Sequence, residues 1–179
     1  MTLAFARAYE QTATRITGPV SFAALQQLAA LDHGTHILDV AAGTGALSVP
    51  AAHAGAAVTA VDIAPGMVEL LTERLSPFPA AQAFAMDGEA LSFPDESFDA
   101  ALSIFGVSLF RDWRKGLAEM TRVVRAGGQI VVATWRSPPG GGPFVLMAEA
   151  LRATFPDRPA PAAPEGFITL GEPDGMTAA

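Results

Sequence analysis

Residues 40–61 contain no Asp, Glu, Lys or Arg, and an aspartate flanks this run on each side, Asp39 before it and Asp62 after it. The run is as long as a membrane span. It consists mostly of alanine, valine and glycine, however, and Pro50 and Gly55 interrupt it. We therefore expect a buried strand, a turn, a helix and a second buried strand here, and no membrane-spanning helix.

Strand-like and helix-like segments alternate along the sequence that follows, which is typical of a parallel sheet with helices on both faces. Pro65 suits the first turn of a helix, Asp112 suits a helix N-cap, and Gly127 and Gly128 suit a helix end. The expected strands are 36–42, 56–62, 82–87, 98–105 and 129–135, and the expected helices are 45–54, 65–75 and 113–126. The sequence thus predicts an α/β fold with a mostly parallel sheet.

The two ends of the chain differ from this alternating core, which is expected over 35–136. Residues 1–34 predict a helical cap, in which Ser21 begins a helix with an apolar face formed by Phe22, Leu25, Leu28 and Leu31. Residues 137–179 predict a linker, a helix over about 144–155 and a proline-rich segment. The prolines within 156–166 predict no regular structure there, and "GEPDGMTAA" resembles the start of a helix. We expect one domain overall.

Composition restricts the classes of function. With 50% hydrophobic and 16% charged residues, a chain of 179 residues can bury an ordinary core. A net charge of −7 repels phosphate backbones and argues against a nucleic-acid partner. The absence of cysteine excludes disulfides, a thiolate metal site and a cysteine nucleophile, and no metal site is expected. The N-terminal sequence lacks the apolar core of a signal peptide, so we expect a cytoplasmic location.

The stretch "LDVAAGTG" predicts a ligand site at the first strand-to-helix turn, because ligands of open α/β sheets bind at the carboxyl ends of the strands. Gly43 and Gly45 let a ligand approach the backbone, and Thr44 adds a hydroxyl. Asp39 places a carboxylate near the end of the first strand, facing a ligand with a positive charge or a hydrogen-bond donor. Asp62, at the end of the second strand, suits the two hydroxyls of a ribose.

Dinucleotides and S-adenosylmethionine both suit such a turn. The dinucleotide pattern G-x-G-x-x-G fails here because its third glycine is replaced by Ser48. A pyrophosphate also tolerates Asp39 poorly, whereas a cofactor that carries an ammonium group suits this carboxylate better. The residues therefore favour S-adenosylmethionine.

Four stretches in order, "LDVAAGTG", "VDIAPGM", "AMDGEALSFPDESFDAALS" and "RVVRAGGQIVVATW", resemble the class I S-adenosylmethionine-dependent methyltransferases of the small-molecule type. That group includes the ubiquinone and menaquinone biosynthesis methyltransferases. The resemblance implies a Rossmann-like three-layer αβα sandwich and methyl transfer to oxygen, carbon or nitrogen of a small molecule. It implies the cofactor-binding residues Asp39, Ala41, Gly43, Thr44, Gly45, Asp62, Ile63, Met67, Asp87, Gly88, Ser103 and Phe105.

The resemblance also assigns roles to these residues. Asp39 lies near the methionine ammonium, Asp62 binds the ribose, and Ile63 and Met67 contact the adenine. The loop of Asp87 and Gly88 binds the adenine amino group, whereas Ser103 and Phe105 face the sulfonium and the acceptor. A solvated loop remains open for Asp87, and a core position for Phe105.

The sequence departs from this family at two positions and at its C-terminal end. Ala41 stands where many relatives have glycine, and Ala64 replaces a helix-capping serine. Methyltransferases of this fold also end with two further strands, which in this sequence are missing or displaced. Either the chain is truncated or its sheet closes differently, and an exposed sheet edge predicts self-association as a homodimer.

No catalytic residue is predicted, because the sulfonium is already an activated leaving group and the protein mainly has to align the reactants. Two alternatives remain. A nicotinamide-dependent oxidoreductase would need an acid such as a Tyr-Lys pair, but the single tyrosine, Tyr9, precedes the core. The other is a non-catalytic cofactor-binding or partner protein. Tyr9, Arg15 and Thr17 could line the site, but a surface helix is the favoured interpretation.

Overall fold

The computed structural model describes residues 1–29, 31–136, 142–157, 163–172 and 174, with the helical path alone given for 142–147. Its centre is a five-stranded sheet in which every neighbouring pair is parallel, in the order β3-β2-β1-β4-β5. The strands are β1 His36–Val40, β2 Ala57–Asp62, β3 Ala81–Ala85, β4 Phe98–Ile104 and β5 Val124–Ala133. The predicted α/β fold with a parallel sheet is confirmed, and the strand order reverses between β1 and β4.

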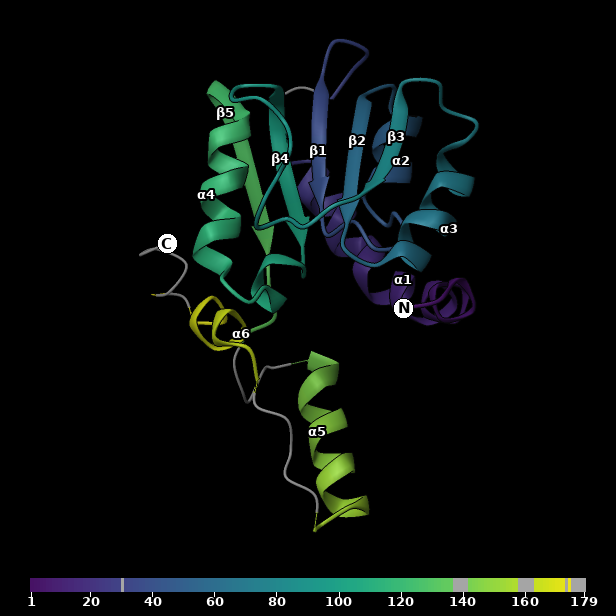
Figure 1. Ribbon diagram of the computed structural model, residues 1–179, viewed down its shortest axis with the longest axis vertical. Helices are drawn as coiled ribbons and strands as arrows, with labels where there is room; N and C mark the ends of the chain where they lie inside the picture. The colour runs from purple at the N-terminus through teal and green to yellow at the C-terminus, as the bar shows by residue number, and fades with distance from the viewer. Residues whose placement is uncertain (30, 137–141, 158–162, 173, 175–179) are drawn as a thin grey trace.

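Helices cover both faces of the sheet (Figure 1). The helices of the described residues are α1 Leu3–Leu25, α2 Ser48–His53, α3 Pro65–Leu75, the 3-10 helix η1 Val107–Leu109, α4 Trp113–Val123, α5 Gly142–Thr154 and α6 Glu165–Thr169. Among the described residues, no helix combines the length and apolar character that a membrane crossing requires. Helix α5 projects away from the sheet in Figure 1, so the layered part of the fold ends with β5 and α6.

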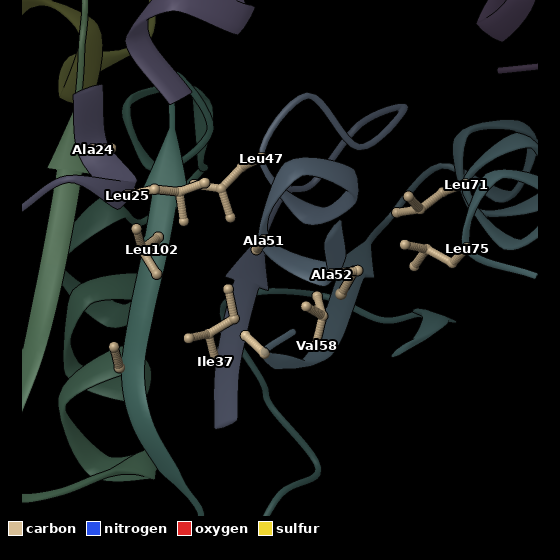
Figure 2. Packing of buried hydrophobic residues seen from close by; sticks show 13 residues of the cluster. Ala24, Leu25, Ile37, Leu47, Ala51, Ala52, Val58, Leu71, Leu75 and Leu102 are labelled. Carbon is tan, nitrogen blue, oxygen red and sulfur yellow. The ribbon is translucent and has the colours of Figure 1, made fainter. Parts of the chain in front are cut away.

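Two apolar clusters hold these layers together. On one face, Ile37 and Val58 of the sheet pack against the C-terminal end of α1 and against α2 and α3, as Figure 2 shows. On the other face, Leu38 of β1 and Ala101 of β4 belong to a cluster with Met120 of α4. The alternation of side chains along each strand explains why consecutive residues of β1 serve different layers.

Most predicted elements begin or end within three residues of the observed ones. Pro65 is the first residue of α3, and Asp112 caps α4 by accepting a hydrogen bond from the Lys115 N–H at 3.1 Å. The stretch 40–61 contains the end of β1, a turn, α2 and most of β2, as predicted.

The predicted start of the N-terminal helix at Ser21 is wrong. One helix runs from Leu3 to Leu25, and the hydroxyl of Thr2 caps it by accepting a hydrogen bond from the Phe5 N–H at 3.3 Å. Ser21 is buried inside this helix, whereas Phe22 is 59% exposed and does not face the core. Leu28 and Leu31 do pack on the core, but they lie beyond the helix end. Ser21 therefore does not act as an N-cap, because the helix is already continuous through this position.

Two further predictions near the C-terminal half are wrong. Helix α4 ends at Val123, and Gly127 and Gly128 lie inside β5, where the register with β4 shifts. The two consecutive valines at 123 and 124 are both buried, and the strand begins at the second one, next to Phe98. The short helix α6 begins at Glu165, inside the segment for which no regular structure was expected. Most of the linker and of "GEPDGMTAA" lies outside the described residues.

Candidate functional site

The turn between β1 and α2 has an unusual backbone. Three of its residues have positive φ, Ala41 at 58°, Gly43 at 56° and Gly45 at 92°. A Cβ atom at Gly45 would lie 2.4 Å from the side chain of Leu71. Helix α2 begins at Ser48, three residues later than predicted, so residues 41–47 form an open turn at the carboxyl end of the sheet.

Asp39 lies buried beneath this turn, with 2% of its surface exposed. Its carboxylate accepts a hydrogen bond from the Ser48 hydroxyl at 2.5 Å. Burial raises the pKa of Asp39 and the nearby Asp62 carboxylate adds to this effect, whereas hydrogen bonds from Ser48 oppose it, so that the resulting pKa is about 7. Because this pKa lies near neutral pH, a charged group that approaches the turn changes the protonation state of Asp39.

Asp62 fastens the turn to the end of β2. One carboxylate oxygen accepts a hydrogen bond from the Gly43 N–H at 2.8 Å, and the other accepts one from the Ala64 N–H at 2.8 Å. The side chain is 8% exposed overall. The structure therefore brings Asp39, Asp62 and the glycine turn together at one rim of the sheet, as the sequence predicted.

Helix α1 lies over this rim and contributes side chains to a small hollow of about 40 Å³. Tyr9, Thr17 and Ser21 of α1 line it together with Asp39, residues 41–44 and Ile104, among others. The Ser21 hydroxyl is fully buried and has no hydrogen-bond partner. Burial and the carboxylates of Asp62 and Glu10 raise the pKa of Tyr9. Tyr9, which is 37% exposed, and the half-buried Thr17 therefore lie at the surface and also border the hollow, whereas Arg15 is exposed and does not line it.

An ion pair between α1 and α3 fixes the position of α1. Glu10 pairs with Arg74 at 2.6 Å and also accepts a hydrogen bond from the Thr44 hydroxyl. Arg74 donates in turn to the Thr44 carbonyl at 2.6 Å. Sequence reasoning missed Glu10 and Arg74, because no spacing or motif relates two residues on separate helices.

The remaining predicted residues on the β2 and β3 side lie apart from the hollow. Ile63 is 69% exposed, whereas Met67 is 4% exposed and packs beneath α1. Asp87 is exposed, and its carboxylate accepts a hydrogen bond from the Glu89 N–H at 2.9 Å. Gly88 is buried, and a Cβ atom there would lie 2.5 Å from the Phe110 ring.

The end of β4 is held by side chains of its own chain. The Ser103 hydroxyl is buried, donates to the Val40 carbonyl at 2.8 Å and accepts from the Val107 N–H at 3.2 Å. Phe105 has a φ of 62° and stacks on Trp135, with ring centroids 4.0 Å apart. In this structure Ser103 therefore joins the ends of β1 and β4, and Phe105 lies at the same rim.

Ala41 offers a direct test of strain in the turn, because a φ of 58° is costly for a residue with a Cβ atom. We expect Ala41→Gly to raise the free energy of unfolding by about 0.5–1 kcal/mol, since glycine adopts this conformation without the steric cost. Urea unfolding of both proteins measures this difference. Ala42→Gly, next to it and without positive φ, is the control and should destabilise.

The parallel sheet, the reversal of strand order beside the glycine turn and the carboxylate at the end of β2 define the class of Rossmann-like folds that bind a nucleoside at this rim. The model of the methyltransferase domain family matches residues 38–132, which is more than half of the chain. The protein belongs to this family.

Relatives and solved structures agree with that assignment. A demethylmenaquinone methyltransferase from Mycobacterium sp. strain KMS is 35% identical over 94% of this chain and 74% of its own length. Another, from Renibacterium salmoninarum, is 43% identical over 69% of this chain. The chain spans about half the length of that relative, 51%, and 43% of the one from Clavibacter sepedonicus.

Two solved structures show the same fold. A protein described as a methyltransferase from an antibiotic biosynthesis pathway of Anabaena variabilis has a TM-score of 0.58, with 30% identity over 66% of this chain and 45% of its own. A methyltransferase from Aquifex aeolicus has a TM-score of 0.60 with 19% identity, over 69% of this chain and 68% of its own. The αβα architecture is thus shared with methyltransferases of solved structure.

Proposed function

We propose that this protein binds S-adenosylmethionine at the rim formed by Asp39, the glycine turn and Asp62, and transfers the methyl group to a small-molecule acceptor. The convergence of two carboxylates on a turn with little side-chain bulk, where the strand order reverses, carries this proposal. The bound cofactor supplies a methyl group on a sulfonium, which is already activated for transfer.

The chemistry of the described residues fits this cofactor. Asp39 and Asp62 are acceptors for an ammonium group and for ribose hydroxyls, and the buried Ser21 hydroxyl needs a partner that a polar ligand group would provide. The hollow of about 40 Å³ is far smaller than the roughly 300 Å³ or more of small-molecule sites. Binding therefore requires α1 to move away from the turn, which means breaking the Glu10–Arg74 contact.

Some of the predicted residues have a defined role in this proposal. Asp62 binds the ribose, Asp39 faces the ammonium, and the exposed carboxylate of Asp87 accepts from the adenine amino group. Ile63, exposed beside Asp62, offers the adenine an apolar surface. The remaining predicted contacts are Ala41, Gly43, Thr44, Gly45, Met67, Gly88, Ser103 and Phe105.

The chain's own contribution to the reaction is alignment and the exclusion of water. Helix α1 covers the rim, and the end of β4 positions Phe105 where an acceptor would approach. No group of three or more His, Asp or Glu side chains in the described part of the chain is arranged to hold a metal ion.

Calorimetric titration with S-adenosylmethionine and with NAD tests the proposal. We expect saturable binding of the first and none of the second, and a folded protein without affinity for S-adenosylmethionine would refute it. Transfer of a radioactive methyl group to reduced demethylmenaquinone then tests the acceptor suggested by the relatives' names. Binding without transfer to any quinone or phenol would favour a non-catalytic role.

The homodimer and the cytoplasmic location expected from the sequence remain predictions. Support for the homodimer comes from β5, whose outer edge pairs with no other strand among the described residues. Sedimentation equilibrium distinguishes a dimer from a monomer.

A further inference from the structure

The segment between β3 and β4, residues 86–97, has no helix or strand of its own, yet it is bound tightly to α4. At its far end, Arg122 of α4 donates to the carbonyls of Leu91 and Phe93 at 2.9 and 2.8 Å. The same guanidinium pairs with Asp95 and Glu119, each at 2.8 Å. One end of the segment is therefore held by α4 itself.

The other end is held by the backbone of β2, through the Met86 N–H that donates to the Asp62 carbonyl at 3.0 Å, and by the side chain of Glu89. One of its carboxylate oxygens accepts hydrogen bonds from the Arg111 N–H at 2.7 Å and from the Asp112 N–H at 3.1 Å. Asp112 is the N-cap of α4. These two backbone donors precede the helix, so Glu89 satisfies groups that the helix cannot. Hydrogen bonds to a charged acceptor are among the stronger ones in proteins.

Glu89 also contacts the residue that recognises adenine in the proposed function. Its own N–H donates to one oxygen of the Asp87 carboxylate at 2.9 Å, and Asp87 as a whole residue is exposed. Between them, Gly88 lies so close to Phe110 that a Cβ atom would be 2.5 Å from the ring. The position of Asp87 thus depends on how residue 89 is held against residues 110–112.

We propose that Glu89 is a positioning residue: by binding the N–H groups of Arg111 and Asp112, it holds Asp87 where its free oxygen selects the adenine amino group. This inference rests on the proposed cofactor. It assigns nucleobase selectivity to a side chain that does not touch the base, and it links the adenine side of the site to the segment 105–112 at the end of β4.

The test compares binding of S-adenosylhomocysteine and S-inosylhomocysteine: hypoxanthine has a carbonyl oxygen where adenine has its amino group, and an N–H at N1 where adenine has an acceptor nitrogen. A carboxylate that accepts from the amino group repels this oxygen, so the protein should prefer the adenine ligand by at least about tenfold. In Glu89→Ala we expect the affinity for the adenine ligand to fall by about tenfold and the preference to shrink to about twofold. Calorimetry measures both affinities without catalysis.

The controls separate positioning from a general loss of structure. Glu89→Gln keeps an oxygen that accepts both N–H groups and should retain most of the preference. Glu165→Gln removes an exposed carboxylate of α6 that pairs with Arg114 of α4, and it should change nothing. In an Asp87→Ala background, Glu89→Ala should have little further effect on the preference. If Glu89→Ala does not fold, Glu89→Asp, whose shorter side chain reaches the two donors less well, replaces it.

The outcomes are distinguishable. A wild-type protein that binds neither ligand refutes the proposed function and this inference with it. Binding with no preference for adenine, or an unchanged preference in Glu89→Ala, refutes the inference alone. Equal weakening of both ligands in Glu89→Ala would show a merely structural role and would also overturn it.

Discussion

The affinity of the protein for S-adenosylmethionine is expected to rise as the pH increases from about 5 and to level off above about 7, near the pKa of Asp39. Below that pKa the Asp39 carboxyl is mostly protonated and neutral. A ligand with an ammonium group binds better to the ionised carboxylate. Binding must then release a proton, which lowers the affinity by up to about tenfold for each pH unit below 7. Over two units the expected change is about a hundredfold.

Isothermal titration calorimetry in buffers of different ionisation enthalpy measures both the affinity and the proton released. The range from about pH 5 to pH 7.5 stays below the pKa of about 7.7–8.0 typical of an α-amino group. Asp39→Asn, which is isosteric and cannot ionise, should bind more weakly and without this pH dependence. A steep pH profile that persists in Asp39→Asn would assign it to another group.

The same pKa has a consequence for stability that serves as an independent check. Because folding raises the pKa of Asp39 from 3.8 to about 7, the folded state holds the proton more tightly than the unfolded state. The stabilisation is present below about pH 4 and is lost as the pH rises through about 7, by up to about 4 kcal/mol in all. In urea unfolding, Asp39→Asn should show little of this pH dependence of the free energy of unfolding.

Asp62→Ala is expected to weaken binding of S-adenosylmethionine by about 1–3 kcal/mol, because it removes charge-assisted hydrogen bonds to the ribose. The structure adds a second reason. The same carboxylate holds the Gly43 N–H and the Ala64 N–H, so its loss releases the turn from the end of β2. Calorimetry with S-adenosylhomocysteine measures the loss.

Two variants show which of these reasons dominates. Asp62→Asn keeps one oxygen for a backbone N–H and should retain more affinity than Asp62→Ala, with a smaller fall in the free energy of unfolding. Glu73→Gln, at an exposed position of α3 where the carboxylate pairs with Arg7, is the control for removing a carboxylate elsewhere. An unchanged affinity in Asp62→Ala would remove Asp62 from the site.

The sequence was most informative where local patterns and the sheet agree. The position of Asp39 and Asp62 at neighbouring strand ends follows from two apolar runs that each end in an aspartate, because parallel strands place their carboxyl ends together. Pro65 begins α3 and Asp112 caps α4 through contacts within a few residues of sequence. Their roles could therefore also be predicted from local sequence.

What the sequence could not reveal depends on contacts between distant elements. Helix α1 has no strong apolar stripe, and its path over the rim is set by Glu10 with Arg74 and by the close approach of Thr2 to Gly66. The roles of Ser21 and Tyr9 follow from that path. The end of α4 was misplaced because glycines within β5 look like helix stops, although a register shift in the sheet requires one of them.

The hydroxyl of Ser103 joins the carbonyl of Val40 across 63 residues of chain. Residues so distant in sequence come into contact late in folding, because closing the long loop between them costs conformational entropy. Folds with many such contacts therefore fold slowly. The junction of β1 and β4 at this rim therefore cannot form in a partly folded fragment that lacks β4. A ligand held there would stabilise the sheet as a whole, so that its affinity and the protein's resistance to unfolding rise and fall together.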